Sequence, residues 1–443
     1  MIEFFTDPVL FAPTIGSMLM CCLAAFVGTF AVLKRQSLVG ETLSHACYPG
    51  VVLALLLSKL FFEVAPDAFL MLVPMIGASL SCLLGMYLVQ ILTLRFKVTQ
   101  DSALCFVLAS FFGLALVVLS LLQSPFPTLY KELQSYLFGQ AATQTNIHIV
   151  VYAILSLLIL STTILFFRPI KTVIFDPNFA KTIGINCESV HLLLLGIIVS
   201  SVVIGIRSLG VVLMSAMLIF PAVSCRFWTV RLEFLLFFSA LFGTISGFFG
   251  VYFSHQMSMI TEVSFPTGPM IVVIASLIFF LSSMLAPQKG ILFRAIRRVK
   301  FWSQCQQENL LKALWKRCSQ KRSPAISRNE IQHLFQAKPY KLTLLLSAIR
   351  RRGWIKVTGI DTYEMTAFGM LWGRKILRLH RLWEVYLVEY CGVGKDRVHP
   401  SAEEMEHIIT KEIENELVVL LDDPHVDPHH QPIPTGEGNL LLP

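Results

Sequence analysis

Charged side chains are scarce in the first two thirds of the chain. Residues 1–290 hold only 13 Lys and Arg and 11 Asp and Glu, separated by long runs of Leu, Val, Ala and Phe. So few charges exclude an ordinary soluble domain there, and the 55% of hydrophobic residues in the whole chain is typical of a membrane protein. Residues 291–443 hold the remaining 23 basic and 17 acidic residues. We therefore predict a membrane domain over 1–290 and a soluble part after it.

Several motifs of other protein classes are also missing. The ten cysteines include no C-x-x-C pair, so neither a disulfide framework nor a thiolate zinc site is expected. No G-x-x-x-x-G-K-[ST] occurs, so the chain is not expected to bind ATP in the usual way, and we do not expect an enzyme. The absence of H-E-x-x-H argues against an intramembrane metalloenzyme. Because Glu3 and Asp7 stand where a signal peptide has basic residues, no cleavable leader is expected.

Nine apolar stretches have about the length that crosses a membrane as a helix, roughly 20 residues. They lie near residues 12–33, 39–58, 68–94, 102–123, 147–167, 189–206, 210–228, 234–253 and 268–286. Placing Lys34 and Arg35 inside leaves only Lys59, Lys131 and Arg207 outside among the basic residues of this part. The expected fold is an all-α polytopic membrane protein, with its N-terminus outside and its soluble part cytoplasmic.

An acidic and an imidazole side chain stand in the second apolar stretch, at Glu41 and His45. A spacing of four places them on one face of a helix, about one turn apart. Ionisable groups at membrane depth are costly and usually face a pathway or a partner. Pro49-Gly50 follow one turn later and would widen a cavity beside them. The spacing alone fits equally well a buried histidine that is satisfied by Ser44 or by a carbonyl.

This stretch resembles the signature of the permease subunits of metal-importing ABC transporters of the manganese, zinc and iron type. The resemblance rests on Leu33-Lys34-Arg35, Gly40-Glu41, Ser44-His45-Ala46 and Pro49-Gly50, and it covers roughly residues 10–290. It implies that Glu41 and His45 line the ion path, with Glu where the family more often has Asp. It also implies a bacterial inner membrane location and three partners: an ATP-binding subunit that supplies the energy, an extracytoplasmic metal-binding protein and a second permease subunit.

A short polar stretch, residues 175–186, lies between the fifth and sixth apolar stretches. Asp176 followed by Pro177 is a helix-start signal, and the stretch is too short and polar to span a membrane. Taken alone, it fits an ordinary loop with a capped turn. In the resembled family the equivalent segment is the coupling helix that docks on the ATPase, which implies that role for Asp176, Ala180 and Gly184.

Basic residues dominate residues 294–322, where Glu308 is the single acid. Part of this charge is the collar expected on the inner side of a membrane, where it attracts anionic lipid headgroups. Ser303–Gln307 lack strong structure signals, so the connector from about Pro287 to Ser323 is a candidate site of nicking that would release the soluble part. The alternatives are that the same residues form the first helix of the soluble part and that the soluble part works while tethered to the membrane.

The next residues follow the order of a winged helix-turn-helix, predicted over 324–366. Ser327 and Glu330 form a capping box that opens a short helix, and Pro339 opens a second helix that runs to about residue 352. A small hairpin follows over 354–365. A lone basic helix is usually a solvated face, but in this order it points to operator DNA. The residues expected near the phosphates are Lys341, Arg350, Arg351 and Arg352.

Imidazoles and carboxylates cluster on the helices predicted over 366–390 and from residue 398 onward. His380 and Glu384 are four residues apart, and so are His399 and Glu403. Such side chains suit a divalent first-row metal ion, although each pair taken singly also fits an acidic surface helix. The candidate ligands are His380, Glu384, His399, Glu403, Glu406 and His407.

This part resembles the metal-dependent repressors of the diphtheria-toxin-repressor and manganese-repressor family. The match runs through residues 380–384, through His399 with residues 406–407, and through residues 427–434. It implies one site of His380, Glu384 and His399. It implies a second site from Glu403, Glu406 and His407, with Glu403 where iron-type members have Cys and the manganese type has Glu. The ligand positions of the family's first helix match Asn309 and Lys312, and a lysine is no metal ligand.

A permease followed by such a regulator resembles known permease–repressor fusions. The expected organisation is a permease domain over 1–290, a basic linker and first helix over 291–323, a winged helix-turn-helix over 324–366, an α-helical metal-binding and dimerisation domain over 367–434, and a tail over 435–443. The implied function is import of iron, manganese or zinc, joined to repression of transcription by the same ion. The alternative is a membrane-tethered metal sensor without transport activity.

Overall fold

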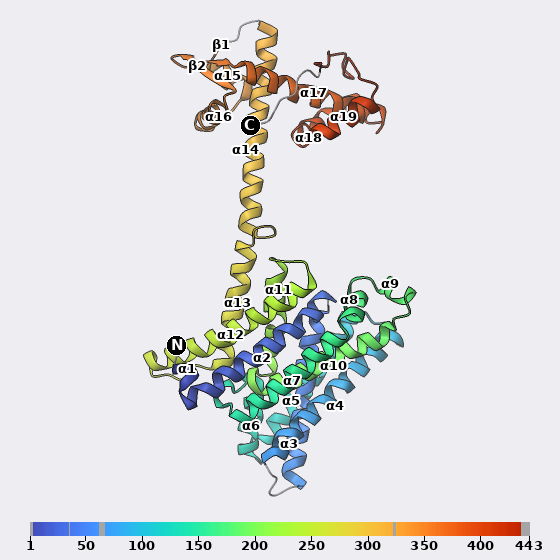
Figure 1. The fold of residues 1–443 in the computed structure, drawn as a ribbon, viewed down its shortest axis with the longest axis vertical. Coiled ribbons are helices and arrows are strands. Elements are labelled where there is room, and N and C mark those ends of the chain that lie inside the picture. Colours follow the sequence, from blue (N-terminus) through green and yellow to red (C-terminus); the bar gives the residue numbers. More distant parts are fainter. Residues whose placement is uncertain (1–2, 35, 62–66, 322–324, 436–443) are drawn as a thin grey trace. The chain divides into compact units, whose positions relative to one another are not determined.

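The computed structural model describes residues 3–34, 36–61, 67–321 and 325–435. The chain divides into two compact units, residues 1–294 and 295–443 (Figure 1). Each unit has buried apolar clusters of its own. We describe them separately, the first as the membrane unit and the second as the regulator unit.

The membrane unit consists of helices in its described residues. Their bounds are α1 Glu3–Thr6, α2 Pro8–Leu33, α3 Ser37–Phe61, α4 Asp67–Leu94, α5 Gln100–Leu122, α6 Pro127–Phe138, η1 Ala141–Thr143, α7 Asn146–Leu165, α8 Phe167–Phe175, α9 Pro177–Thr182, α10 Cys187–Leu209, α11 Val211–Arg226, α12 Leu232–Thr261 and α13 Thr267–Leu285.

Within the described residues, eight of these helices are long and apolar enough to cross a membrane. They are α2, α3, α4, α5, α7, α10, α12 and α13. The seventh apolar stretch of the sequence, near 210–228, also forms a helix, but α11 has only 16 residues and is shorter than a typical span. The polytopic all-α fold predicted from the sequence is therefore confirmed, with eight long spans and one short apolar helix.

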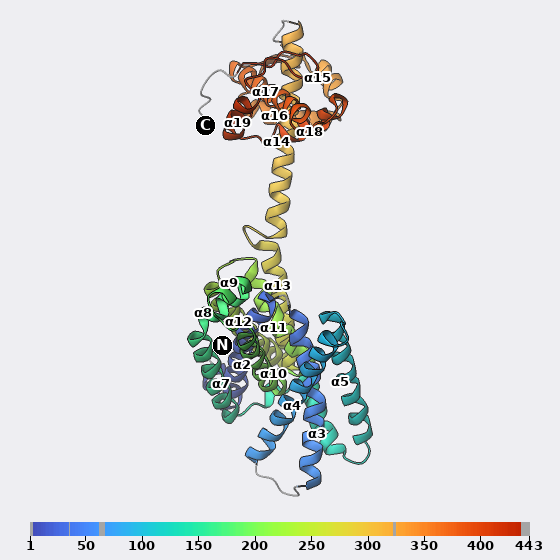
Figure 2. The ribbon, with the colours of Figure 1, turned by 90° about the vertical axis from the view of Figure 1, so that its right-hand side faces the viewer.

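Helix α2 packs closely against α11 and α12 in the middle of the membrane unit (Figure 2). A Cβ atom at Gly28 of α2 would lie 1.8 Å from the carbonyl oxygen of Leu218 of α11. A Cβ atom at Gly243 of α12 would lie 2.3 Å from the carbonyl oxygen of Cys21 of α2. Small residues let helices approach this closely where lipid offers no hydrophobic driving force between them. Helices α3, α4 and α5 form a second packed group (Figure 2).

The regulator unit combines helices with a small sheet. Helix α14 starts four residues before the unit boundary, and its bounds and those of the later elements are α14 Ile291–Lys321, β1 Ala325–Ser327, α15 Arg328–Phe335, α16 Pro339–Arg351, β2 Ile355–Gly359, β3 Thr362–Met365, α17 Ala367–Glu389, η2 Lys395–Arg397, α18 Val398–Met405 and α19 Lys411–Leu420. The sheet has the antiparallel order β1-β3-β2. Ser327 caps α15 by accepting a hydrogen bond from the Glu330 amide at 3.3 Å, as the capping-box pattern predicts.

One core joins α14 to the winged part of the regulator unit. Its buried members include Leu310, Leu314, Ile331, Leu342, Ile349 and Trp354, which come from α14, α15, α16 and the residue before β2. Helix α17 continues from this core and packs against α18 and α19. Helix α19, which the sequence analysis did not anticipate, buries Leu417 against Leu379.

The connector between the units differs from the nicking site proposed from the sequence. Ser303–Gln307 lie inside α14, which is continuous from Ile291 to Lys321, so the alternative of a first helix is the correct one. The interval contains neither Gly nor Pro, and its second half is held in the core by Leu310, Leu314 and Cys318. The last part of the predicted linker, residues 322–323, and most of the tail lie outside the described residues.

Candidate functional sites

Glu41 and His45 lie on one face of α3, close to α5. The His45 ring meets the Phe112 ring edge to face, with 4.6 Å between their centroids. The Nδ1 atom of His45 is buried and has no hydrogen-bond partner among the described residues. The Ser44 hydroxyl, one residue away, donates to the Gly40 carbonyl at 2.8 Å. The imidazole therefore keeps a nitrogen available in an apolar setting.

The neighbours of His45 on α3 do find partners, which sets this histidine apart. The Tyr48 hydroxyl donates to the Leu133 carbonyl at 3.1 Å, and the Thr42 hydroxyl donates to the Leu104 carbonyl at 3.3 Å. The Cys47 thiol donates to the Ser44 carbonyl at 2.6 Å. Buried polar groups are normally satisfied in this way. An unpaired one beside a carboxylate is the kind of group that can bind a ligand.

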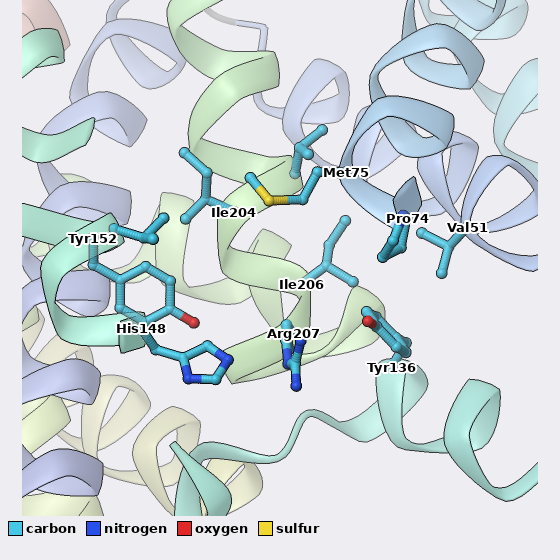
Figure 3. A pocket seen from close by; sticks show the side chains of 11 residues that line it. Val51, Pro74, Met75, Tyr136, His148, Tyr152, Ile204, Ile206 and Arg207 are labelled. Carbon is cyan, nitrogen blue, oxygen red and sulfur yellow. The ribbon is translucent and has the colours of Figure 1, made fainter. Parts of the chain in front are cut away.

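A second polar cluster lines a small cavity among α3, α4, α6, α7 and α10 (Figure 3). Tyr136, His148, Tyr152 and Arg207 surround a space of about 20 Å³, enough for roughly one water molecule. The His148 Nδ1 atom accepts a hydrogen bond from the Thr145 amide at 3.1 Å, which leaves Nε2 as the protonated nitrogen. Sequence reasoning missed His148, although its spacing of four from Tyr152 was available as a signal.

Helix α9 forms a short capped turn that α8 supports. The Asp176 carboxylate accepts a hydrogen bond from the Phe179 amide at 2.9 Å, and Ala180 is fully buried. Gly184 ends the turn with φ +81°, a conformation that side-chain-bearing residues rarely adopt. The structure thus places all three residues of the predicted coupling segment on or beside α9. The exposed side of the segment is apolar, since Phe179 is 54% and Ile183 is 52% exposed.

In the regulator unit, α17 and α18 bring His380, Glu384 and His399 together. The three side chains offer ligand atoms that all lie within 4.8 Å of one another. The His399 Nδ1 atom is 2.8 Å and the His380 Nε2 atom is 3.3 Å from the same Glu384 carboxylate oxygen. Burial would raise the pKa of Glu384, but hydrogen bonds from His380 and His399 outweigh it and lower this pKa to about 2. The carboxylate is therefore ionised at neutral pH.

The other predicted triad is not gathered into one set. Glu403 is exposed and lies 3.9 Å from the His399 Nε2 atom, nearer to the first group. Glu406 is fully buried and accepts hydrogen bonds from the Lys312 ammonium at 2.6 and 2.8 Å. His407 turns instead to α14, where its Nδ1 atom donates to the Glu308 carboxylate at 2.6 Å. The Glu406 carboxylate thus pairs with Lys312 and also accepts a hydrogen bond from the His380 ring of the first group.

Two further acidic residues join this region. Glu308, which sequence analysis recorded only as an isolated acid, binds His407 from α14. Asp427 and His429 form a second possible ligand set with Glu384. Asp427 is also structural, because its carboxylate accepts hydrogen bonds from the backbone amides of His429 and Gln431 at 2.8 Å each. Spacing could not have revealed either contact, since the partners come from distant segments.

The basic side chains predicted for α16 have different surroundings. Arg350 and Arg351 are exposed at the end of the helix. The Lys341 ammonium donates to the Gln306 amide oxygen at 3.1 Å and lies 4.6 Å from the centre of the Trp302 ring. Arg352 lies just beyond the helix and stacks on Trp354, with 5.0 Å to the ring centre. Lys341 is therefore partly engaged by α14.

Comparison with known proteins gives the following matches. Residues 6–286 match the ABC 3 transport family, and residues 366–435 match the metal binding and dimerisation domain of iron dependent repressors. A probable metal transport system membrane protein of Chlamydia trachomatis is 33% identical, over 97% of both chains. The manganese transport system membrane protein MntC of Bacillus subtilis is 31% identical, over 84% of this chain and 82% of MntC. The structure of PsaBC from Streptococcus pneumoniae in complex with Fab has a TM-score of 0.56 at 24% identity, covers 65% of this chain and 96% of its own, and shares the fold.

Proposed function

The chain belongs to the ABC 3 transport family, and from this premise we propose that its membrane unit imports a divalent metal ion. It is a multi-pass membrane protein that carries a permease domain and a repressor-type metal-binding domain in one chain. The permease itself is not an enzyme. We place the N-terminus outside and the regulator unit in the cytoplasm, because the basic residues follow the positive-inside rule.

The observation that carries the transport proposal is the unpaired His45 beside Glu41. An imidazole nitrogen and a carboxylate oxygen are good ligands for manganese, iron or zinc. In an apolar helix bundle they can replace part of the water shell of an ion that passes between α3 and α5. The ion is the substrate here, so the site must bind it weakly enough to release it. His45 is the residue on which we base the path.

Energy for this import would come from a separate ATP-binding subunit. We assign its docking to the apolar surface of α9, where Phe179 and Ile183 are half exposed. A capped helix with apolar side chains pointing outward fits a groove on a partner. An extracytoplasmic metal-binding protein would deliver the ion, and a second permease subunit, of the same or a related chain, would complete the path.

The regulator unit would sense the imported ion. His380, Glu384 and His399 fit a divalent ion because two nitrogens and a carboxylate converge without any thiolate. When bound, the ion supplies a link between α17 and α18 that is stronger than their present hydrogen bonds. These ligands suit iron or manganese most closely, and zinc would also bind them. With metal bound, two regulator units would dimerise and place two α16 helices on operator DNA.

The test uses the whole protein in lipid nanodiscs and the DNA that precedes its own coding sequence. Retention of that DNA should require manganese, ferrous iron or zinc, each tried separately. Glu384→Gln should abolish the metal dependence, because the amide cannot provide the anionic ligand. Glu389→Gln, at the exposed end of the same helix, is the matched control and should respond normally. Metal-responsive retention by the Glu384→Gln chain would refute the proposed sensor.

A further inference from the structure

The first part of α14, residues 291–302, has an apolar face whose side chains are exposed in the described part of the chain. Ile291, Leu292, Ile296, Val299 and Trp302 fall on one side of the helix at the spacing expected for a continuous stripe. Their exposed fractions are 57%, 43%, 52%, 66% and 54%. We call residues 291–302 the basic amphipathic segment.

The opposite face of this segment is strongly basic. Arg294, Arg297, Arg298 and Lys300 lie there, with the exposed rings of Phe293 and Phe301 between them, and residues 291–307 contain no acidic side chain. A helix with one apolar face and one basic face is typical of segments that lie on anionic membrane surfaces.

The exposed stripe contrasts with the second half of the same helix. Leu310, Leu311 and Leu314 are completely or almost completely buried in the core of the regulator unit. Among the described residues, Trp302 of the stripe contacts another element, because the Lys341 ammonium lies over its ring. The apolar face of the segment is therefore not explained by the packing of the unit to which it leads.

We propose that residues 291–302 lie on a lipid surface and bind anionic headgroups, with the apolar stripe buried at the boundary between headgroups and acyl chains. The chain itself holds the segment near lipid, because five residues separate it from the end of α13 at Leu285. The basic face supplies charge complementarity, and each basic residue near an anionic surface strengthens binding by about fivefold. The proposal rests on the proposed function only in taking α13 as a membrane span.

A second copy of the chain is the competing occupant of the stripe. Pairing two copies through this face would bring two sets of four basic residues together, and the segment offers no acidic residue to balance them. A membrane with anionic lipid provides the balancing charge without any change in the protein. The charges therefore favour lipid over self-association.

The experiment measures hydrogen–deuterium exchange of the full-length chain in nanodiscs that hold one copy each. Amides of residues 291–302 should exchange at least about fivefold more slowly in phosphatidylglycerol discs than in phosphatidylcholine discs. High salt should remove the difference. Arg298→Gln with Lys300→Gln should also remove it, while Arg350→Gln with Arg351→Gln, which deletes two charges elsewhere, should leave it intact.

A second variant removes apolar side chains of the stripe and keeps all four basic residues. Ile296→Ser with Val299→Ser should lose the protection without disturbing the core, because both side chains are exposed. Equal exchange in the two lipids would overturn the proposal. Protection that appears only in discs with two copies would assign the stripe to self-association and would also overturn it. These results do not depend on whether the chain transports metal. Slow exchange of the α13 amides reports separately that α13 is inserted in the membrane.

Discussion

At the scale of single residues, two side chains are the most informative. One is His45, whose buried Nδ1 atom has no partner among the described residues, and the other is Lys312, which pairs with the buried Glu406. A buried polar atom without a partner costs about 1–3 kcal/mol, and the His45 Nδ1 atom is one of these. The family resemblance, not the spacing, pointed to this residue in the sequence, because spacing alone fitted a histidine bonded to Ser44. In the structure the Ser44 hydroxyl donates to the Gly40 carbonyl, and the His45 Nδ1 atom has no partner among the described residues, which favours the path interpretation.

His45→Ala should abolish uptake of manganese or iron by cells that depend on this transporter, because the path loses its nitrogen ligand. The amount of protein in the membrane should not fall, since the ring makes one aromatic contact and no hydrogen bond from Nδ1. Uptake of a radioactive ion, normalised to membrane-inserted protein, is the measurement. His255→Ala, near the end of α12, is the matched control. Normal uptake by the His45→Ala chain would disprove the path assignment.

The pairing of Lys312 with Glu406 could not be foreseen from local spacing. The two residues are 94 positions apart, and the ion pair is almost completely buried, with side chains 8% and 0% exposed. Sequence reasoning had identified Lys312 as a non-ligand where the resembled family has a ligand, but it could not say what the ammonium does there. The Lys312 ammonium neutralises the Glu406 carboxylate, which the sequence analysis expected to bind metal.

Lys312→Gln should therefore make the regulator unit less stable without metal and more responsive to metal. Breaking a buried ion pair leaves an uncompensated charge and typically costs about 3–5 kcal/mol. A divalent ion would restore the balance, so the rise in Tm on adding manganese should be larger than in the unchanged protein. The control is Lys316→Gln, one turn further along α14. An equal metal-induced rise in Tm for both variants would contradict this role of Lys312.

At the scale of elements, helices with strong end signals were the easiest to predict. Asp176-Pro177, Ser327 and Pro339 each begin a helix in the structure as their types suggest. Helix α14 was harder because its first half has polar runs and its second half is stabilised by contacts with α15 and α16, which no local pattern shows. Helix α19 escaped prediction because its short amphipathic pattern is too brief to stand out.

The apolar surface of α9 gives the prediction that belongs to this scale. Phe179→Asp with Ile183→Asp should reduce co-purification of the ATP-binding subunit, because both side chains are half exposed and would lose their contact with it. Phe96→Asp, at a residue that is 66% exposed after α4, is the control for adding a charge to an exposed phenylalanine. Gly184→Pro should have the same effect through the backbone, since proline cannot adopt φ +81°. Full recovery of the ATPase with these variants would count against α9 as the docking element.

At the scale of the whole molecule, release of the regulator unit depends on where the backbone is open. Helix α14 protects residues 291–321, whereas residues 286–290 form a non-helical turn between α13 and α14 whose side chains at 287–289 are exposed. Nicking favours exposed turns over helices. If the unit is released by cutting between the described helices, the fragment should begin in this turn and retain the basic amphipathic segment.

Tags at both ends of the chain test this directly. We expect either the intact 49.7 kDa protein alone or a C-terminal fragment of about 17 kDa, at ~110 Da per residue from this turn onward. The fragment should sediment with membranes at low salt and become soluble at high salt, because four basic residues at its start bind anionic lipid. A fragment that starts inside α14, at Ser303–Gln307, would show that the helix does not protect this stretch.

Carrying both units on one polypeptide also fixes their numbers in the cell. Each ribosome that finishes a permease has finished a regulator, so the ratio of the two stays constant through every burst of expression. A repressor made from its own gene can lag behind the transporter or drift in copy number. Here each increase in transporter synthesis adds an equal number of regulator units at the same time. The capacity for repression therefore rises in proportion to the amount of transporter.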